Sequence, residues 1–300
     1  MQKLIIEVRM NEYATRSGNP NVPWTPREII EDALACREAG ASSVHFHCRT
    51  GEGRPDHSFE SYREVVSGLR AKSDLLLHPT LGADENGGSP AKRLSYVTRL
   101  AEQGLAVDLA PMDMGSTNVD FLDSDTGEFT TVDKVYINTT ATLIEFAKAF
   151  REMGMKPCLA TWNVGMLQLA QAFVRKGLVD APPFLALSLG GEDTLPLHPA
   201  SSAGLAAFTT LLAPDIAAQW TVIVFGGSIM GIAEEVIRKG GHLSMGLGDH
   251  PYSEFGVPTN ADIVRRIVQL ARDCGRDVAT PDEARSILGM SGAPALAAAY

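Results

Sequence analysis

Two histidines, His45 and His47, stand one residue apart in the strand-like segment 43–49. Side chains alternate along a strand, so both imidazoles project to one side and Phe46 to the other. Imidazoles spaced in this way are suited to two positions on one metal ion, with an Asp, Glu, Cys or third His completing the set. The alternative is a pair of half-buried polar residues held by hydrogen bonds. The pair ends a strand and runs into the Gly/Pro-rich segment 50–55, which favours the metal site.

The third metal position has three candidates. His250 and His78 are preferred equally, and Asp249 follows them. The side chain of His250 points to the same side as position 248 only if the last strand continues that far. His78 should face the barrel interior on the strand next to the His pair. A divalent ion there would polarise a ketone oxygen and lower the cost of forming an enolate. Asp249 or Glu12 is the expected general base.

Two short segments are candidates for binding a substrate anion. Thr80 and the backbone amides around Gly82 form one possible cradle for a carboxylate. The amides of Gly226-Gly227-Ser228, which precede a helix, are a second, for a phosphate. For the second segment, a tight turn without a ligand is the favoured interpretation.

The composition is that of a globular enzyme. The chain has 300 residues, of which 45% are hydrophobic and 21% charged. Lys+Arg number 26 and Asp+Glu 36, so the net charge is −10, and no basic block suggests a nucleic-acid surface. No apolar run reaches the ~20 residues of a membrane helix. The scattered cysteines and a first segment too short for a signal peptide predict a cytoplasmic protein.

Strand-like and helix-like segments alternate along the chain. Thr25 and Glu28 predict a capped helix start, and Thr280 and Glu283 repeat the pattern near the end. A small hairpin is expected around residues 121–130. The expected strands are 4–10, 43–49, 75–80, 106–112, 156–161, 184–189, 220–224 and 242–247. Eight such units predict a single-domain α/β fold, a parallel (β/α)8 TIM barrel. The barrel is expected to span residues 1–290, followed by an Ala/Gly/Pro-rich tail, 291–300.

Motifs along nearly the whole chain resemble those of the β-keto acid cleavage enzymes, the 3-keto-5-aminohexanoate cleavage protein family. The similarity rests on the order and spacing of the following motifs. They are Asn19-Pro20-x-Val22-Pro23-x-Thr25, Glu38-Ala39-Gly40-Ala41, His45-x-His47-x-Arg49, Pro79-Thr80-x-Gly82, Met114-Gly115-Ser116-x-Asn118, Gly165-Met166-Leu167, Trp220-Thr221-Val222, Gly240-Gly241-His242, Thr259-Asn260, Val278–Ala284 and Ile287-Leu288-Gly289.

This resemblance implies a TIM barrel that forms a homo-oligomer, a tetramer or dimer. It implies Zn²⁺, or another divalent metal, bound by His45 and His47 together with a Glu after strand eight. It also implies transfer between a small β-keto acid and acetyl-CoA, which yields acetoacetate and an acyl-CoA. Asp249 matches the catalytic Asp, and Thr80, Gly82 and Ser116 fall within the substrate-binding motifs.

The sequence departs from the family pattern at several of these positions. Gly248-Asp249-His250 stands where the family has Glu-Asp-Asn, so the third ligand is missing from its usual place. Gly227 replaces the Arg that partners the catalytic Asp; Arg49 is one candidate cation, although a structural role is favoured for it. Cys158 and Ala160 replace acidic residues, Pro111 replaces a Thr, and the strand-one Glu falls near Tyr13, with Glu12 one step away. Two alternatives therefore remain: a metal-dependent aldolase, decarboxylase or hydrolase without CoA, and a non-catalytic barrel.

Overall fold

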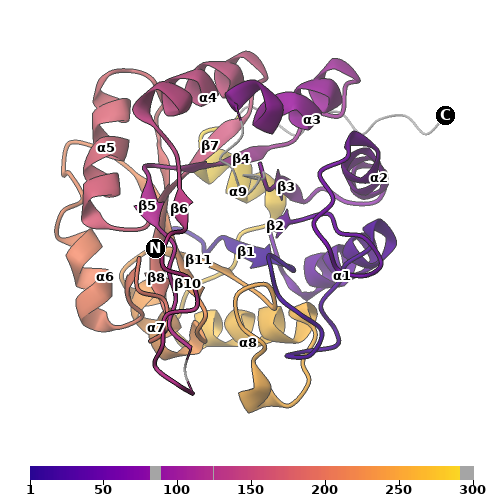
Figure 1. The fold of residues 1–300 in the computed structure, drawn as a ribbon, viewed down its shortest axis with the longest axis vertical. Helices are drawn as coiled ribbons and strands as arrows, with labels where there is room; N and C mark the ends of the chain where they lie inside the picture. Colours follow the sequence, from indigo (N-terminus) through magenta and orange to yellow (C-terminus); the bar gives the residue numbers. More distant parts are fainter. Residues whose placement is uncertain (82–88, 124, 291–300) are drawn as a thin grey trace.

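Eight parallel strands form a nearly closed barrel in the computed structural model, which describes residues 1–81, 89–123 and 125–290 (Figure 1). This confirms the predicted (β/α)8 fold. The order around the barrel is β3-β2-β1-β11-β10-β8-β7-β4. The Asp108 N–H donates to the Leu77 carbonyl at 3.1 Å, which links β4 back to β3. The barrel strands are β1 Ile6–Arg9, β2 Ser43–Phe46, β3 Leu76–Pro79, β4 Leu109–Asp113, β7 Lys156–Thr161, β8 Phe184–Gly190, β10 Gln219–Phe225 and β11 His242–Met245.

Helices follow the strands and cover the outside of the barrel (Figure 1). The predicted capping boxes are confirmed: Thr25 with Glu28 begins α1, and Thr280 with Glu283 begins α9. The predicted fourth strand begins later than expected, because α3 is followed by a turn in which the Leu105 N–H bonds the Leu100 carbonyl. The helices are α1 Pro26–Ala39, α2 Phe59–Arg70, α3 Pro90–Glu102, α4 Thr140–Glu152, α5 Val164–Arg175, α6 Ser202–Thr209, α7 Met230–Arg238, α8 Asn260–Asp273 and α9 Pro281–Ile287, with a 3-10 turn η1 at Ser253–Phe255.

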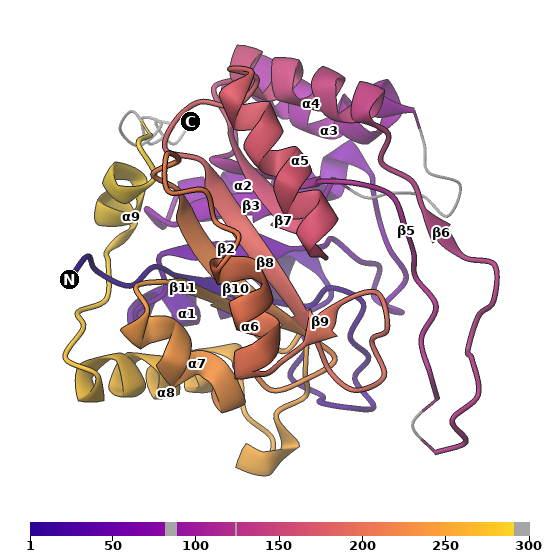
Figure 2. The same ribbon diagram turned by 90° about the vertical axis from the view of Figure 1, so that its left-hand side faces the viewer.

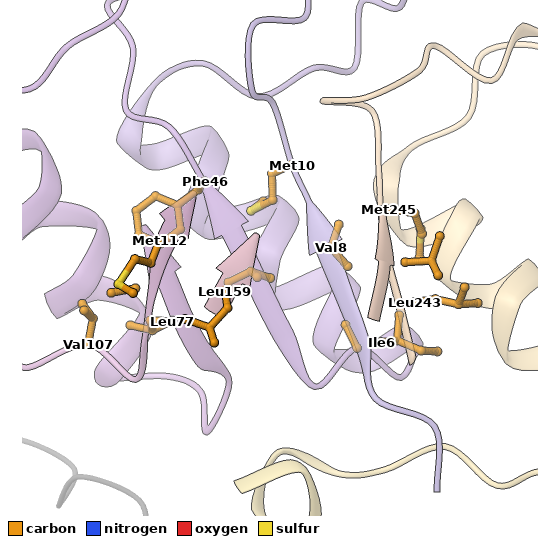
Figure 3. Close-up of a cluster of buried hydrophobic side chains, with 14 of the residues drawn as sticks. Ile6, Val8, Met10, Phe46, Leu77, Val107, Met112, Leu159, Leu243 and Met245 are labelled. Carbon is orange, nitrogen blue, oxygen red and sulfur yellow. The ribbon is translucent and has the colours of Figure 1, made fainter. Parts of the chain in front are cut away.

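The pleat of the strands separates an outer apolar layer from a polar barrel interior. Figure 3 shows Ile6, Val8 and Phe46 among the side chains buried between the sheet and the helices. The alternate residues of β1, Glu7 and Arg9, are buried on the other face. Inside the barrel, a smaller apolar cluster fills the end against which α9 packs.

Two additions mark the two ends of the barrel. Figure 2 shows α9 at one end and an arm built on β5 Thr117–Asn118 and β6 Val135–Tyr136 at the other. The predicted hairpin forms the tip of this arm, where Leu122 pairs with Phe129 in an antiparallel bridge. A further short strand, β9 His198–Pro199, pairs with β8. Gly82 and the predicted tail, 291–300, lie outside the described residues. Among the helices that the structure describes, none has the length and apolar character to cross a membrane.

We expect Asp108→Ala to cost about 3–5 kcal/mol of unfolding free energy, because it removes the carboxylate partner of buried Arg70 and leaves buried Arg285 with only the exposed Asp282. Asp108 accepts from Arg70 Nη2 at 2.6 Å and from Arg285 Nη2 at 3.1 Å, and all three residues are buried. Urea unfolding measures the loss. Asp215→Ala breaks the exposed pair with Arg175 and should cost less than about 1 kcal/mol. If Asp108→Ala lost as little unfolding free energy as the control, Asp108 would not be stabilising the fold through its buried arginine partners.

A second prediction concerns acid stability. His242 Nδ1 accepts the Ile5 N–H at 3.0 Å, and burial, followed by Arg276, lowers the pKa of His242 to about 3. The unfolded imidazole titrates near 6.5, so this stability is complete above about pH 6.5 and is lost as the pH falls toward 3, at up to about 1.4 kcal/mol per unit. His242→Asn keeps an acceptor and cannot titrate. Urea unfolding measures the free energy of unfolding at about pH 7 and at about pH 5. The fall in this free energy between the two pH values should be smaller for His242→Asn than for the unmodified protein. Equal losses would refute the prediction.

Candidate active site

The His pair lies at the C-terminal end of β2, inside the barrel mouth. His45 and His47 are 4% and 8% exposed, and their Nε2 atoms are 3.2 Å apart. Their rings meet edge to face, with centroids 5.2 Å apart. The side chain of Phe46, between them, packs in the outer apolar layer. The predicted alternation, with both imidazoles on one side, is confirmed.

Glu12 completes a three-residue group with these histidines. Its Oε1 lies 3.2 Å from His45 Nε2 and its Oε2 lies 2.6 Å from His47 Nε2. One ligand atom from each residue falls within 4.8 Å of the others. Two imidazole nitrogens and one carboxylate oxygen are the donor set of many catalytic zinc sites, so the residues fit a divalent cation. Glu12 reaches them from the turn after β1, where its φ of 31° lies in the left-handed region that costs a non-glycine residue energy.

Gly248 explains how Glu12 gains this position. A Cβ atom at residue 248 would lie only 2.6 Å from the Glu12 Cγ and 2.9 Å from the Arg9 carbonyl oxygen. The family's ligand Glu would start from this position, so its side chain and that of Glu12 compete for the same space. Glycine at 248 therefore leaves room for a carboxylate delivered by β1 instead of β11.

The other predicted third ligands have different partners. His250 Nδ1 accepts the Tyr252 N–H at 3.0 Å and lies 3.9 Å from Glu254. His78 Nδ1 lies 2.8 Å from Glu7 Oε2. Within the described ranges, Glu12 is the residue that groups with the His pair. The geometry thus favours Glu12, predicted as a base, over His250 as the third ligand.

Arg9 pairs with Asp249 across the barrel mouth. Arg9 Nε donates to Asp249 Oδ1 at 3.0 Å, and Arg9 Nη2 lies 3.1 Å from Glu12 Oε1. This guanidinium supplies the cation that Gly227 cannot. Arg49, the candidate named from the sequence, donates instead to the backbone carbonyls of Ala14 and Asn11. The sequence signal for Arg9 was available, because it alternates with Glu7 as a second charged residue in an apolar strand.

Burial and charge set the protonation states of the site. Burial raises the pKa of Asp249 to about 7 against the opposing effect of Arg9, and its Oδ2 is buried without a hydrogen-bond partner in the part of the chain described. Burial lowers the pKa of His45 to about 4, so its imidazole is neutral at neutral pH and able to bind a metal. Burial opposes ionisation of Glu12, but Arg9 and the His pair hold its pKa well below the usual value. The site therefore combines a neutral imidazole on His45, an ionised carboxylate on Glu12 and a carboxyl group on Asp249 whose pKa is raised to about 7.

Thr80 and Ser116, two of the predicted substrate-binding residues, lie around the same mouth. Thr80 is buried just after β3, and its N–H donates to the Phe46 carbonyl at 3.1 Å. Ser116 begins the arm, and its Oγ accepts the Asn138 N–H at 2.9 Å. The segment 226–228 makes a tight turn before α7, with Gly226 at φ 67° and the Ser228 Oγ accepting the Met230 N–H. A hollow of about 270 Å³ beside Asp249 is lined by the loop after β1 and the loop after β11.

An aromatic group on the opposite rim was not anticipated from the sequence. Asp113, at the end of β4, accepts from Tyr136 Oη at 2.7 Å and from Trp162 Nε1 at 2.8 Å. The rings of Tyr136 and Trp162 stack with centroids 5.7 Å apart, and Phe225 lies next to Trp162 at 6.0 Å. Arg9 sits 4.8 Å from the Phe225 ring centroid, which connects this rim to the His pair. The position of Asp113 at a strand end was visible in the sequence, but its partners come from distant segments.

The fold and the site define a (β/α)8-barrel enzyme with a candidate metal centre at the C-terminal mouth of its strands. Residues 3–290 match the family described as beta-keto acid cleavage enzyme. The chain is 30% identical over 294 residues to a 3-keto-5-aminohexanoate cleavage enzyme of Fusobacterium nucleatum, covering 97% of this chain and 99% of that protein. The chain belongs to the beta-keto acid cleavage enzyme family.

Two further similarities extend this assignment. A 3-dehydrocarnitine:acetyl-CoA trimethylamine transferase of Rhizobium meliloti is 28% identical over 297 residues, covering 92% of this chain and 93% of that protein. The apo structure of ObcA superposes with a TM-score of 0.72 at 15% identity, covering 90% of this chain. The match spans 66% of the ObcA chain, and at this identity it supports the fold alone.

We expect Glu12→Gln to weaken Zn²⁺ binding by more than about 100-fold, a loss greater than outer-shell changes produce. The reason is that the substitution removes the charged donor of the group. Competition with a chromophoric chelator measures the affinity. His250→Asn is the matched control and should bind zinc like the unmodified protein. A loss confined to the His250 variant would instead identify His250 as the ligand.

Proposed function

We propose that this protein is a divalent-metal-dependent β-keto acid cleavage enzyme that uses acetyl-CoA, with Zn²⁺ as the metal. Its products are acetoacetate and the CoA thioester of the remaining acyl group. The observation that carries the proposal is the convergence of Glu12, His45 and His47 beside the buried Asp249. The Rhizobium meliloti relative carries acetyl-CoA in its name, and the Fusobacterium nucleatum relative names a β-keto acid.

His45, His47 and Glu12 would hold the metal. Bound there, a divalent cation supplies Lewis acidity toward a ketone oxygen. The neutral imidazole of His45 and the ionised carboxylate of Glu12 already have the protonation states that metal binding requires. All three residues are buried, so water does not weaken the electrostatic attraction between their ligand atoms and a bound cation.

Asp249 acts as the general base in this proposal. The bonds exchanged require the carbon between the ketone and the carboxylate to lose a proton and to bond to the acetyl carbon as the CoA thiolate leaves. That thiolate then bonds to the original ketone carbon, and the bond between this carbon and the new acetoacetate breaks. Asp249 accepts that proton on Oδ2 and returns it to the departing acetoacetate, while Arg9 holds Oδ1 at 3.0 Å. A carboxyl group whose pKa lies near 7 suits transfer in both directions.

The substrate carboxylate is assigned to the rim beside β3. Thr80 follows β3 and bonds to Phe46 between the two histidines, and Ser116 begins the arm after β4. Gly82, which belongs to the same motif as Thr80, is proposed as a backbone contact on the basis of the resemblance. These residues orient the acid, and Asp249 approaches from the side of β11.

We also propose that the chain forms a homo-oligomer, a tetramer or dimer. The arm after β4 exposes several apolar side chains, and exposed apolar groups of this kind are typical of interfaces. They are Phe121, Phe129, Val132, Val135 and Ile137.

The function is tested by incubating the zinc-loaded protein with a panel of β-keto acids, with and without acetyl-CoA. Acetoacetate that forms only with acetyl-CoA supports the proposal. Turnover without acetyl-CoA would identify the aldolase, decarboxylase or hydrolase alternative. Zinc binding without turnover of any acid would identify a non-catalytic barrel.

For the same reaction, we expect Asp249→Asn to reduce turnover by about 10²–10⁴-fold, the usual contribution of a general base. Asparagine keeps an oxygen that can accept from Arg9, and Asp249 is not part of the three-residue group. Zinc affinity should therefore stay near that of the unmodified protein. Unchanged turnover would remove Asp249 from the proposed mechanism.

A further inference from the structure

Two neighbouring imidazoles inside the barrel each keep a buried ring nitrogen that has no hydrogen-bond partner among the residues described. These atoms are Nδ1 of His45 and Nε2 of His78. The two residues are paired in register on β2 and β3, and their rings meet at an angle with centroids 4.6 Å apart. An unpaired buried polar atom is costly, so two adjacent ones need a physical explanation.

Glu7 determines which nitrogen of His78 carries the proton. Glu7 Oε2 lies 2.8 Å from His78 Nδ1, and the carboxylate also accepts from the hydroxyls of Ser43 and Ser244 at 3.1 Å and 2.7 Å. The two hydroxyls that donate to it stabilise the ionised form of this buried carboxylate. An ionised carboxylate can only accept, so Nδ1 of His78 is the donor. When His78 carries one hydrogen, that hydrogen is on Nδ1 and its Nε2 is an acceptor.

His45 has the complementary arrangement. Its Nε2 faces the candidate metal centre, 3.2 Å from both Glu12 Oε1 and His47 Nε2. A neutral imidazole that offers its Nε2 lone pair to a metal carries its hydrogen on Nδ1. In that state the unpaired Nδ1 of His45 is a donor, and the ring of His78 is its neighbour on β3.

We propose that His78, oriented by Glu7, is a positioning residue for His45, and that its Nε2 accepts the hydrogen of His45 Nδ1–H when His45 binds a divalent cation. The inference rests on the metal centre of the proposed function. The contact would fix the ring orientation and tautomer of His45 and make its Nε2 a stronger donor to the metal. It also gives His78 a role other than that of third ligand.

A simpler interpretation makes Glu7 a clamp between strands. Its carboxylate joins β1 to Ser43 on β2, His78 on β3 and Ser244 on β11. A clamp alone predicts a change in stability when any of these partners is altered. It predicts no difference in metal affinity between variants that fold equally well. Metal affinity therefore separates the two interpretations.

The first test compares His78→Leu with His78→Gln. Leucine removes the acceptor, whereas the glutamine amide oxygen can take the place of Nε2. We expect Zn²⁺ affinity, measured by chelator competition, to fall about 10–100-fold for His78→Leu and to be largely restored by His78→Gln. The Co²⁺ absorption spectrum at saturation should shift for His78→Leu. Equal affinity and an unchanged spectrum for all three proteins would overturn the proposal.

The second test compares Glu7→Gln with Ser244→Ala, and it remains informative if His78→Leu does not fold. Glu7→Gln removes the charge that keeps the proton on His78 Nδ1, and we expect zinc affinity to fall about tenfold or more. Ser244→Ala removes one hydrogen bond to the same carboxylate and should leave zinc affinity unchanged. Similar losses of melting temperature in both variants, with zinc affinity unchanged in each, would overturn the proposal in favour of the clamp.

Failure of the proposed metal centre itself would be seen separately. If the unmodified protein binds no Zn²⁺ in the same titration, the metal centre is absent and the inference falls with it. If the unmodified protein binds Zn²⁺ and the His78 and Glu7 variants bind it equally well, only the role of His78 and Glu7 is excluded.

Discussion

One buried carboxylate, that of Glu12, contacts both imidazoles of the His pair and the guanidinium of Arg9. Its side chain is only 7% exposed, so its charge depends on these partners for stabilisation. The partners come from β1 and β2, and Arg9 extends the network to Asp249 beyond β11. The position of each group thus depends on the register of the three neighbouring strands, and the rest of the barrel holds that register.

The resemblance implies charged groups after strands seven and eight, whereas here Arg9 and Glu12 supply charge from β1 and the turn after it. The family's Arg after strand seven and Glu after strand eight are represented by Gly227 and Gly248, while Arg9 and Glu12 lie on and just after β1. The close approach of Gly248 to the Glu12 side chain shows that Glu12 occupies space that a side chain at position 248 would need. A barrel permits such exchange because the C-terminal ends of all its strands converge on one site. Residue-by-residue matching along the sequence misses it, since the compensating residues are distant in the chain.

Much of the fold and part of the site were predictable from the sequence. The period of two on β2 placed His45 and His47 together, and the Thr25 cap marked the start of α1. The facing argument for His250 was unsound, because β11 ends at Met245 and the chain then turns, with the His250 N–H bonded to the Gly246 carbonyl. Glu12 was predicted as a base and not as a candidate ligand, because its direction depends on a turn with positive φ, which no pattern of residue types reveals.

The central claim is that a carboxylate from the turn after β1 completes a metal centre on β2. The most direct test is a crystal structure of the zinc-soaked protein with anomalous scattering recorded at the zinc edge. We predict one strong peak about 2.0–2.2 Å from His45 Nε2, from His47 Nε2 and from an oxygen of Glu12. A peak bound by His250 or His78 in place of Glu12, or no peak beside the His pair, would contradict the claim.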